Sequence, residues 1–195
     1  MRKLFSFNMV TLDGFFEGPN REIDWHNVDT EDGEFNEFAV EQLNAMDTLL
    51  FGRVTYQLMA SYWPTPTALE GDPIVAELMN RLPKVVVSRT LDKVEWNNTR
   101  LVKDHVAEEI LKLKQQPGKD IALFGSANLM STLMQLDLID EHRIMVNPVL
   151  LGDGNPLFKK AKDRQSLKLI RTRTIRSGNV LLCYRPDGSR HGGLK

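Results

Sequence analysis

The sequence predicts an α/β fold, in which helices flank a mostly parallel mixed sheet that carries an antiparallel hairpin at its C-terminal end. From residue 3 to residue 136, short runs typical of strands alternate with segments of helical periodicity. In residues 166–185, the dipeptide Ser177-Gly178 separates two alternating runs, which is the pattern of a hairpin. With 195 residues, 42% of them hydrophobic, the chain is long enough to bury one core.

The strands are predicted from apolar or alternating runs that end in turn residues. The three consecutive valines of "KVVVSRT" make this the clearest strand. The expected strands before the hairpin are 3–10, 47–52, 84–90, 120–125 and 141–152.

The helices are predicted from apolar residues spaced three or four apart and from helix-ending residues. Pro64 ends one helix, and Pro117-Gly118 ends another. The expected helices are 34–46, 53–63, a short one after Pro73, 106–114 and 127–136. We expect the segment "TPTALEGDP" (65–73) to be an exposed loop, residues 1–186 to form one domain, and residues 187–195 to be a flexible tail.

Composition limits the partners. A net charge of -1 and a pI near 6.4 give no general attraction to nucleic acid or to an anionic membrane, so a small-molecule partner is expected. The single cysteine, Cys183, excludes an internal disulfide and fits a buried, inert thiol. No signal peptide and no apolar run of about 18 residues is seen, so a cytoplasmic location is expected. The four histidines are scattered, and no metal site is expected.

Three predicted strand-to-helix junctions carry residues suited to an anion. Helix N-termini beside the carboxyl ends of strands present free N–H groups, glycine allows close backbone approach, and arginine adds charge. Two arginines and several phosphate-suited junctions favour NADPH over NADH, although the G-x-G-x-x-G fingerprint is absent. The alternative is that these are loop glycines and solvated arginines. The residues are Gly52, Arg53, Thr55, Ser88, Arg89, Gly125 and Ser126.

Five segments occur in an order that resembles the dihydrofolate reductase-like superfamily, in particular the reductase domain at the C-terminus of RibD. They are "TLDGFFEG", "FGRVTYQ", "VVVSRT", "LFGSANL" and "PVLLGDGNPLF", within Lys3 to Arg185. The resemblance implies a single α/β domain, bound NADPH, hydride transfer and frequent homodimers. It also implies that Gly52, Arg53 and Thr55 face the cofactor phosphates and that Ser88 and Arg89 hold the adenosine end. The pyrophosphate and ribose would be held by Gly125, Ser126, Ala127, Asn128 and Leu129. The backbone after Leu12, with Gly14, would lie along the nicotinamide.

The chain departs from both relatives. It lacks the H-x-E and P-C-x-x-C motifs of the zinc deaminase that precedes the RibD reductase, so that activity is not expected. Dihydrofolate reductases place a carboxylate a few residues beyond a tryptophan. Here Trp25 is followed by the acidic residues Asp29, Glu31, Asp32 and Glu34, so which of them corresponds to that carboxylate is left open. Pterin specificity is left open with it.

Reduction of a C=N bond requires a proton as well as a hydride. Asp13 and Asp32 are the candidate acids, and either would need a raised pKa. The alternatives are that Asp13 is a turn residue that bonds its own backbone, that Asp32 interacts with a helix dipole, and that water supplies the proton. The aromatic residues Phe16, Trp25 and Trp63, with Tyr62, are candidates for stacking on a planar substrate, or for ordinary packing.

The sequence therefore favours an NADPH-dependent reductase of a small heterocycle, resembling 5-amino-6-(5-phosphoribosylamino)uracil reductase of riboflavin biosynthesis or dihydrofolate reductase. Two alternatives stay open. One is a nucleotide-binding module without catalysis. The other is a structural homodimer that uses residues 147–158 as its interface.

Overall fold

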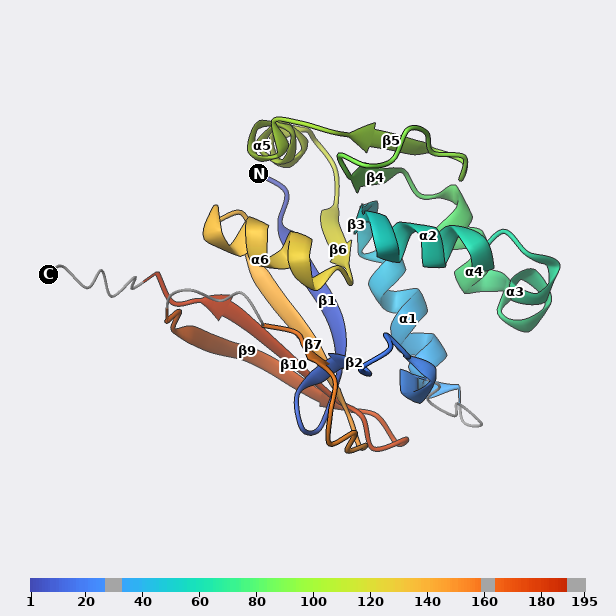
Figure 1. Ribbon diagram of the computed structural model, residues 1–195, viewed down its shortest axis with the longest axis vertical. Coiled ribbons are helices and arrows are strands. Elements are labelled where there is room, and N and C mark those ends of the chain that lie inside the picture. The colour runs from blue at the N-terminus through green and yellow to red at the C-terminus, as the bar shows by residue number, and fades with distance from the viewer. Residues whose placement is uncertain (27–32, 159–163, 189–195) are drawn as a thin grey trace, which may run out of the picture.

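The computed structural model describes residues 1–26, 33–158 and 164–188, and its centre is an eight-stranded sheet (Figure 1). The strand order is β5-β4-β3-β6-β1-β7-β10-β9. Neighbours from β5 to β7 are parallel, whereas β10 is antiparallel to both β7 and β9, as predicted. The bounds are β1 (Leu4–Thr11), β3 (Met46–Gly52), β4 (Lys84–Val87), β5 (Thr99–Val102), β6 (Asp120–Phe124), β7 (Glu141–Asn147), β9 (Leu167–Thr174) and β10 (Val180–Pro186).

Helices cover both faces of the parallel part of the sheet (Figure 1). On one face lie α5 (Val106–Gln115) and α6 (Ala127–Gln135). On the other lie α1 (Glu34–Asn44), α2 (Arg53–Tyr62) and α4 (Pro73–Arg81). A second, two-stranded sheet pairs β2 (Phe15–Glu17) with β8 (Asn155–Pro156), and a short 3-10 helix, η1 (Asp24–His26), precedes α1.

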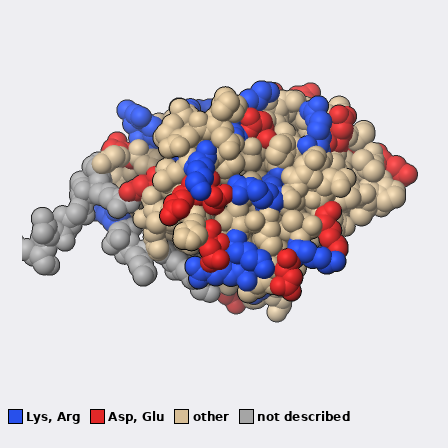
Figure 2. Space-filling model, turned by 90° about the horizontal axis from the view of Figure 1, so that it is seen from above, with Lys and Arg blue, Asp and Glu red and all other residues tan. Residues whose placement is uncertain are grey.

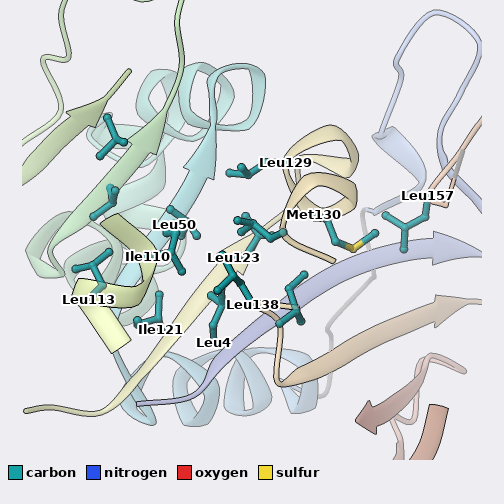
Figure 3. Close-up of a cluster of buried hydrophobic side chains, with 14 of the residues drawn as sticks. Leu4, Leu50, Ile110, Leu113, Ile121, Leu123, Leu129, Met130, Leu138 and Leu157 are labelled. Atoms are coloured by element: carbon teal, nitrogen blue, oxygen red, sulfur yellow. The ribbon is translucent and has the colours of Figure 1, made fainter. Parts of the chain in front are cut away.

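The central strands are mostly apolar because both of their faces are buried. Side chains alternate between the faces, so Leu50 packs with α5 and α6 while Leu49 and Phe51 pack with α1, α2 and α4. Figure 3 shows the hydrophobic cluster on the face of the sheet covered by α5 and α6. In this cluster Met130 of α6 extends toward Leu157. Leu157 is 1% exposed, so the segment 147–158 places this leucine in the core and not on an interface.

One loop prediction is wrong. Within the segment expected to be an exposed loop, Pro66–Gly71 forms a helix, α3. Thr65 caps it by accepting a hydrogen bond from the Ala68 amide at 3.3 Å, and Pro66 occupies the first turn, where its missing N–H costs nothing. Only Ala68 of this helix is buried, so its sequence has no apolar periodicity from which the helix could be predicted. Of the expected tail, Asp187 and Gly188 are described, and residues 189–195 lie outside the described residues.

Membrane-spanning helices and metal-binding clusters are both absent from the part of the chain that the structure describes. None of its helices has the length and apolar character needed to cross a membrane. Its His, Cys, Asp and Glu side chains form no cluster suited to a metal ion. Cys183 is a buried free thiol, and burial raises its pKa.

Candidate active site

Four predicted segments converge at one edge of the sheet. The segments beginning at Leu12, Arg53, Ser88 and Gly125 follow the carboxyl ends of β1, β3, β4 and β6. These four strands are consecutive in the sheet, in the order β4-β3-β6-β1. Because parallel strands end at the same edge, the segments form a continuous rim, which is where open α/β sheets bind ligands.

The middle two junctions are packed tightly against each other. A Cβ atom added to Gly52 would lie 2.8 Å from Ser126 Cβ and closer still to its Oγ. A Cβ atom added to Gly125 would lie 2.9 Å from Thr55 Oγ1 and 3.0 Å from its Cγ2. Each glycine therefore gives space to a hydroxyl-bearing residue of the opposite junction, and the backbones of β3–α2 and β6–α6 come close together.

This contact places two helix N-termini side by side. α2 begins after Gly52 and has no side-chain cap, so its first N–H groups have no side-chain acceptor from the capping residue. α6 begins after Ser126, whose Oγ accepts only weakly from the Leu129 amide at 3.4 Å, while Ala127 and Asn128 occupy its first turn. Gly125 and Ser126 both have left-handed backbones, with φ of 58°. Free N–H groups and the helix dipoles suit this edge to an anion.

Both predicted arginines are available at the rim. The Arg53 side chain is exposed, and its Nη1 donates to Gln57 Oε1 at 3.2 Å. The Arg89 side chain is 84% exposed, and its Nε lies 3.9 Å from Asp104 Oδ1. An exposed pair of this kind is weak, so it leaves Arg89 free to contact a ligand. Ser88 is buried, and its Oγ accepts from the Thr90 and Leu91 amides, which holds the turn that presents Arg89.

Asp13 anchors one loop to another. Its carboxylate accepts hydrogen bonds from Thr11 Oγ1 at 2.6 Å, the Leu151 amide at 3.1 Å and the Gly152 amide at 2.8 Å. The Thr11 hydroxyl, followed by the Gly152 amide, lowers the pKa of this carboxyl. A proton donor needs a raised pKa, so the contacts fit a loop anchor better than an acid. Gly14, with φ of 89°, closes the same turn through its amide to the Thr11 carbonyl. Asp32 lies outside the described residues.

No ring pair joins the three predicted substrate aromatics to one another in the part of the chain that the structure describes. Phe16, on β2, packs against the α5 and α6 cluster, whereas Trp63 packs against the α2 and α4 cluster. Trp63 Nε1 donates to Met59 Sδ at 3.1 Å. Trp25 lies on η1 with its ring edge-on to His26, their centroids 4.2 Å apart. Their roles with a substrate stay predictions.

Two buried asparagines beside the rim, Asn147 and Asn179, are not among the predicted site residues. Asn147 lies opposite Thr11 in the β1–β7 register, and its Nδ2 donates to the Val10 and Met145 carbonyls. Its Oδ1, and both amide atoms of Asn179, are buried without a partner among the described residues. Such atoms cost about 1–3 kcal/mol each unless water or a ligand satisfies them. The signal was a lone asparagine within an otherwise apolar strand, as in "IMVNPV".

The strand order, the parallel centre and the C-terminal antiparallel hairpin define a protein of dihydrofolate reductase-like fold. The chain belongs to the family described as the RibD C-terminal domain, whose model matches residues 2–181. It is 41% identical over 179 residues to the "Uncharacterized protein YyaP" of Bacillus subtilis (strain 168), with 92% of each chain covered. The "Uncharacterized protein YwjB" of the same organism is 29% identical over 168 residues, covering 86% of this chain and 89% of that one.

Solved structures share the fold at low identity. The "Putative riboflavin biosynthesis protein" of Shewanella sp. PV-4 has a TM-score of 0.74 and 22% identity, covering 94% of this chain and 98% of that one. The deaminase/5-amino-6-(5-phosphoribosylamino)uracil reductase of Thermotoga maritima gives 0.66 and 18%, over 95% of this chain and 56% of that one. Dihydrofolate reductase from Enterococcus faecalis, complexed with NADP(H) and RAB-propyl, gives 0.62 and 14%, over 95% and 96%. At these identities the neighbours show the shared fold, and the family match indicates a reductase-type protein.

Proposed function

We propose that the chain is an NADPH-dependent reductase of a small heterocycle, either a pyrimidine such as 5-amino-6-(5-phosphoribosylamino)uracil or a pterin. The contact between the two junctions carries the proposal. Gly52 and Gly125 bring two helix N-termini together at the carboxyl edge, with two exposed arginines on the same rim. The named activities of the Thermotoga and Enterococcus proteins support the reaction class.

The residues at the rim fit a dinucleotide phosphate. In our proposal the amides at the starts of α2 and α6 hold the pyrophosphate, and Arg53 adds a cation beside them. Arg89 holds the 2′-phosphate, because its side chain is exposed at the neighbouring strand end. When bound, NADPH supplies the hydride. The packed glycine junctions keep these amides at fixed positions, so little ordering is required on binding.

The substrate end of the site is proposed on the other side of β6, along β1 and β7. Phe7 and Phe124 lie with ring centroids 5.7 Å apart on β1 and β6, and both are half-buried, which gives an apolar wall that excludes water. The unpartnered Oδ1 of Asn147 is an acceptor for a ring N–H. Asp13 anchors the loop after β1, and Asp32 or water stays our candidate for the proton.

The test is a paired titration of the purified protein with NADPH and NADH, followed by turnover assays with the pyrimidine and with dihydrofolate. We expect binding with a clear preference for NADPH and oxidation of NADPH with one of the two substrates. Failure to bind NADPH at millimolar concentration would end the proposal.

A second function, a nucleotide-binding module without catalysis, is favoured by one observation. Among the described residues, the rim carboxylate Asp13 has a lowered pKa and is held by its hydrogen bonds. The same experiment separates the two functions, because a binding module gives tight NADPH binding and no turnover with any heterocycle.

We also propose a homodimer. The edge strand β9 is uncovered on both faces, with Leu169 49% exposed and Ile170 47% exposed. All six residues from Leu167 to Thr172 are exposed, so this stretch of β9 has no covering layer in a single chain. Sedimentation of the wild type and of Ile170→Lys tests this proposal. We expect a dimer that the substitution weakens, and a monomeric wild type would contradict it.

A further inference from the structure

A cleft lies at the opposite edge of the sheet from the candidate active site. It is about 1120 Å³ in volume and is lined by the segments that enter β3, β4, β5 and β6 and by the ends of α1, α4 and α5. We call it the amino-edge cleft. In Figure 1, α5, β4 and β5 form the top of the molecule, and Figure 2 shows that side, where Lys and Arg side chains lie among Asp and Glu. The residues that line the amino-edge cleft play no part in the candidate active site at the carboxyl-edge rim.

The charge of the cleft differs from that of the whole chain. Its two acidic side chains are Asp47 and Glu109, and its six cationic ones are Arg2, Arg81, Lys84, Arg100, Lys112 and Lys119. The chain as a whole carries a net charge of -1. A cleft with an excess of one sign of charge attracts ions of the opposite sign.

The carboxylates within the cleft do not neutralise these cations. Asp47 pairs with the buried Arg2. Glu109 is shared, because its two oxygens accept from Arg100 Nη1 at 2.6 Å and from Lys112 Nζ at 3.0 Å. Arg81 is exposed, and its side chain takes part in no ion pair within the described ranges. Two carboxylates against six cations leave most of the positive charge in the cleft without a neutralising partner.

A buried cation beneath the cleft strengthens this field. Lys84 is 1% exposed, and its Nζ donates to the carbonyls of Asn80 at 2.9 Å, Leu82 at 2.7 Å and Asn97 at 3.1 Å. No carboxylate of the described residues pairs with it. Burial lowers its pKa to about 8, because the charged form is kept away from water. An anion bound in the cleft would offset the cost of burying this charge.

We propose that the amino-edge cleft binds a small multivalent oxyanion, a molecule that carries two or more phosphate or carboxylate groups. The exposed cations come from separate elements, Arg81 from α4, Arg100 from β5 and Lys112 from α5. Their spread suits an anion with several charged groups better than a single monovalent ion. Arginine also forks two N–H donors onto either a phosphate or a carboxylate. The site is separate from the proposed cofactor site and does not depend on the reductase activity.

Isothermal titration with tripolyphosphate, and in parallel with citrate, tests the proposal. The key variant is Arg81→Glu, and its matched control is Lys168→Glu, which reverses an exposed charge on β9 outside the cleft. A second control, Arg89→Glu, reports on tripolyphosphate bound at the carboxyl-edge rim. We expect wild-type binding that Arg81→Glu weakens about tenfold, that Arg81→Glu with Lys112→Glu weakens further, and that Lys168→Glu leaves unchanged. Arg89→Glu should remove only tripolyphosphate bound at the carboxyl-edge rim and leave the binding that depends on Arg81 intact. The two anions show whether phosphate or carboxylate groups are preferred.

The proposal is overturned if neither anion binds. It is also overturned if Arg81→Glu and Lys168→Glu weaken binding equally, since that result means a general charge effect. Loss of binding in Arg89→Glu alone would place the anion at the other edge. Circular dichroism melts of each variant confirm that it is folded, and Arg81→Gln, which only neutralises the charge, replaces a variant that is not. NADPH titration of the same variants shows separately whether the proposed function holds.

Discussion

Substituting Gly52 by alanine tests the close contact on which the proposed cofactor site depends. The new Cβ would lie 2.8 Å from Ser126 Cβ and closer to Ser126 Oγ. Rotating the serine moves its Oγ, but its Cβ is fixed to the backbone, so the β3–α2 and β6–α6 junctions must separate. Overpacking of this kind costs about 1–3 kcal/mol. The backbone of Gly52, with φ of -83° and ψ of 168°, is allowed for alanine, which returns about 0.4–1 kcal/mol through the unfolded chain.

The matched control is Gly71→Ala. Nothing lies within 4 Å of a Cβ built at Gly71, so only the favourable unfolded-state effect applies. We therefore expect Gly71→Ala to be neutral or slightly stabilising, and Gly52→Ala to lose about 1–2 kcal/mol. In a chain of this length, a loss of that size lowers Tm by roughly 2–8 °C. Urea unfolding and thermal melts measure both quantities.

Ser126→Gly should rescue Gly52→Ala. It removes both atoms that clash, and glycine is better suited than serine to the backbone at position 126, with φ of 58° and ψ of 73°. Glycine at a helix N-cap costs only a few tenths of a kcal/mol relative to serine. We expect the double variant to regain most of the lost stability, and the double-mutant cycle to show a coupling of about 1 kcal/mol or more.

The same variants report on the cofactor. Because Gly52→Ala moves the amides at the starts of α2 and α6 apart, we expect NADPH to bind about tenfold more weakly, equivalent to about 1.4 kcal/mol. Gly71→Ala should bind NADPH like the wild type. If Gly52→Ala matched Gly71→Ala in both stability and NADPH affinity, the close approach of the two junctions would be refuted as a feature of the folded protein.

Three further predictions concern Arg89, Asp13 and His142. Arg89→Glu should weaken NADPH by about tenfold or more in a fluorescence titration and NADH much less, because the exposed guanidinium is proposed to hold the 2′-phosphate. Asp13→Asn should lower Tm near neutral pH, and the difference from wild type should shrink as the pH falls below about 3.9, since the lowered pKa means that the stabilising carboxylate is lost only as it becomes protonated. His142 is buried and its pKa is lowered to about 4, so the unfolded chain takes up the proton first as the pH falls below about 6.5. His142→Gln should therefore lose less free energy of unfolding than wild type between about pH 6.5 and pH 4.

The opposite results are readily distinguished. Equal weakening of NADPH and NADH would remove Arg89 from the 2′-phosphate. A Tm difference for Asp13→Asn that persists unchanged in acid would mean that the carboxylate charge does not anchor the Leu151 and Gly152 amides. Identical acid sensitivity of wild type and His142→Gln would show that this histidine is not held neutral in the core.

Local sequence predicted most of the elements and the three cofactor-type junctions. Alternation of apolar residues, the valines 85–87 and the proline and glycine stops act within a few residues of chain, so they can be seen without tertiary contacts. The missed elements had weak local signals. β5 spans only Thr99–Val102 and β8 only Asn155–Pro156, while α3 buries a single side chain. The hairpin at Ser177-Gly178 was predicted because its turn and both strands are adjacent in sequence.

The sequence by itself determined which residues follow each strand, and the resemblance indicated what they do. Only the tertiary structure decided which strands are neighbours, and hence that β4, β3, β6 and β1 carry their ligand-suited ends side by side. It also decided that Gly52 touches Ser126 and that Asp13 holds the amides of Leu151 and Gly152, 138 and 139 residues away. Such contacts depend on how whole layers pack, and the free energy that selects the packing comes from apolar burial spread over the entire core. No short stretch of sequence contains that information.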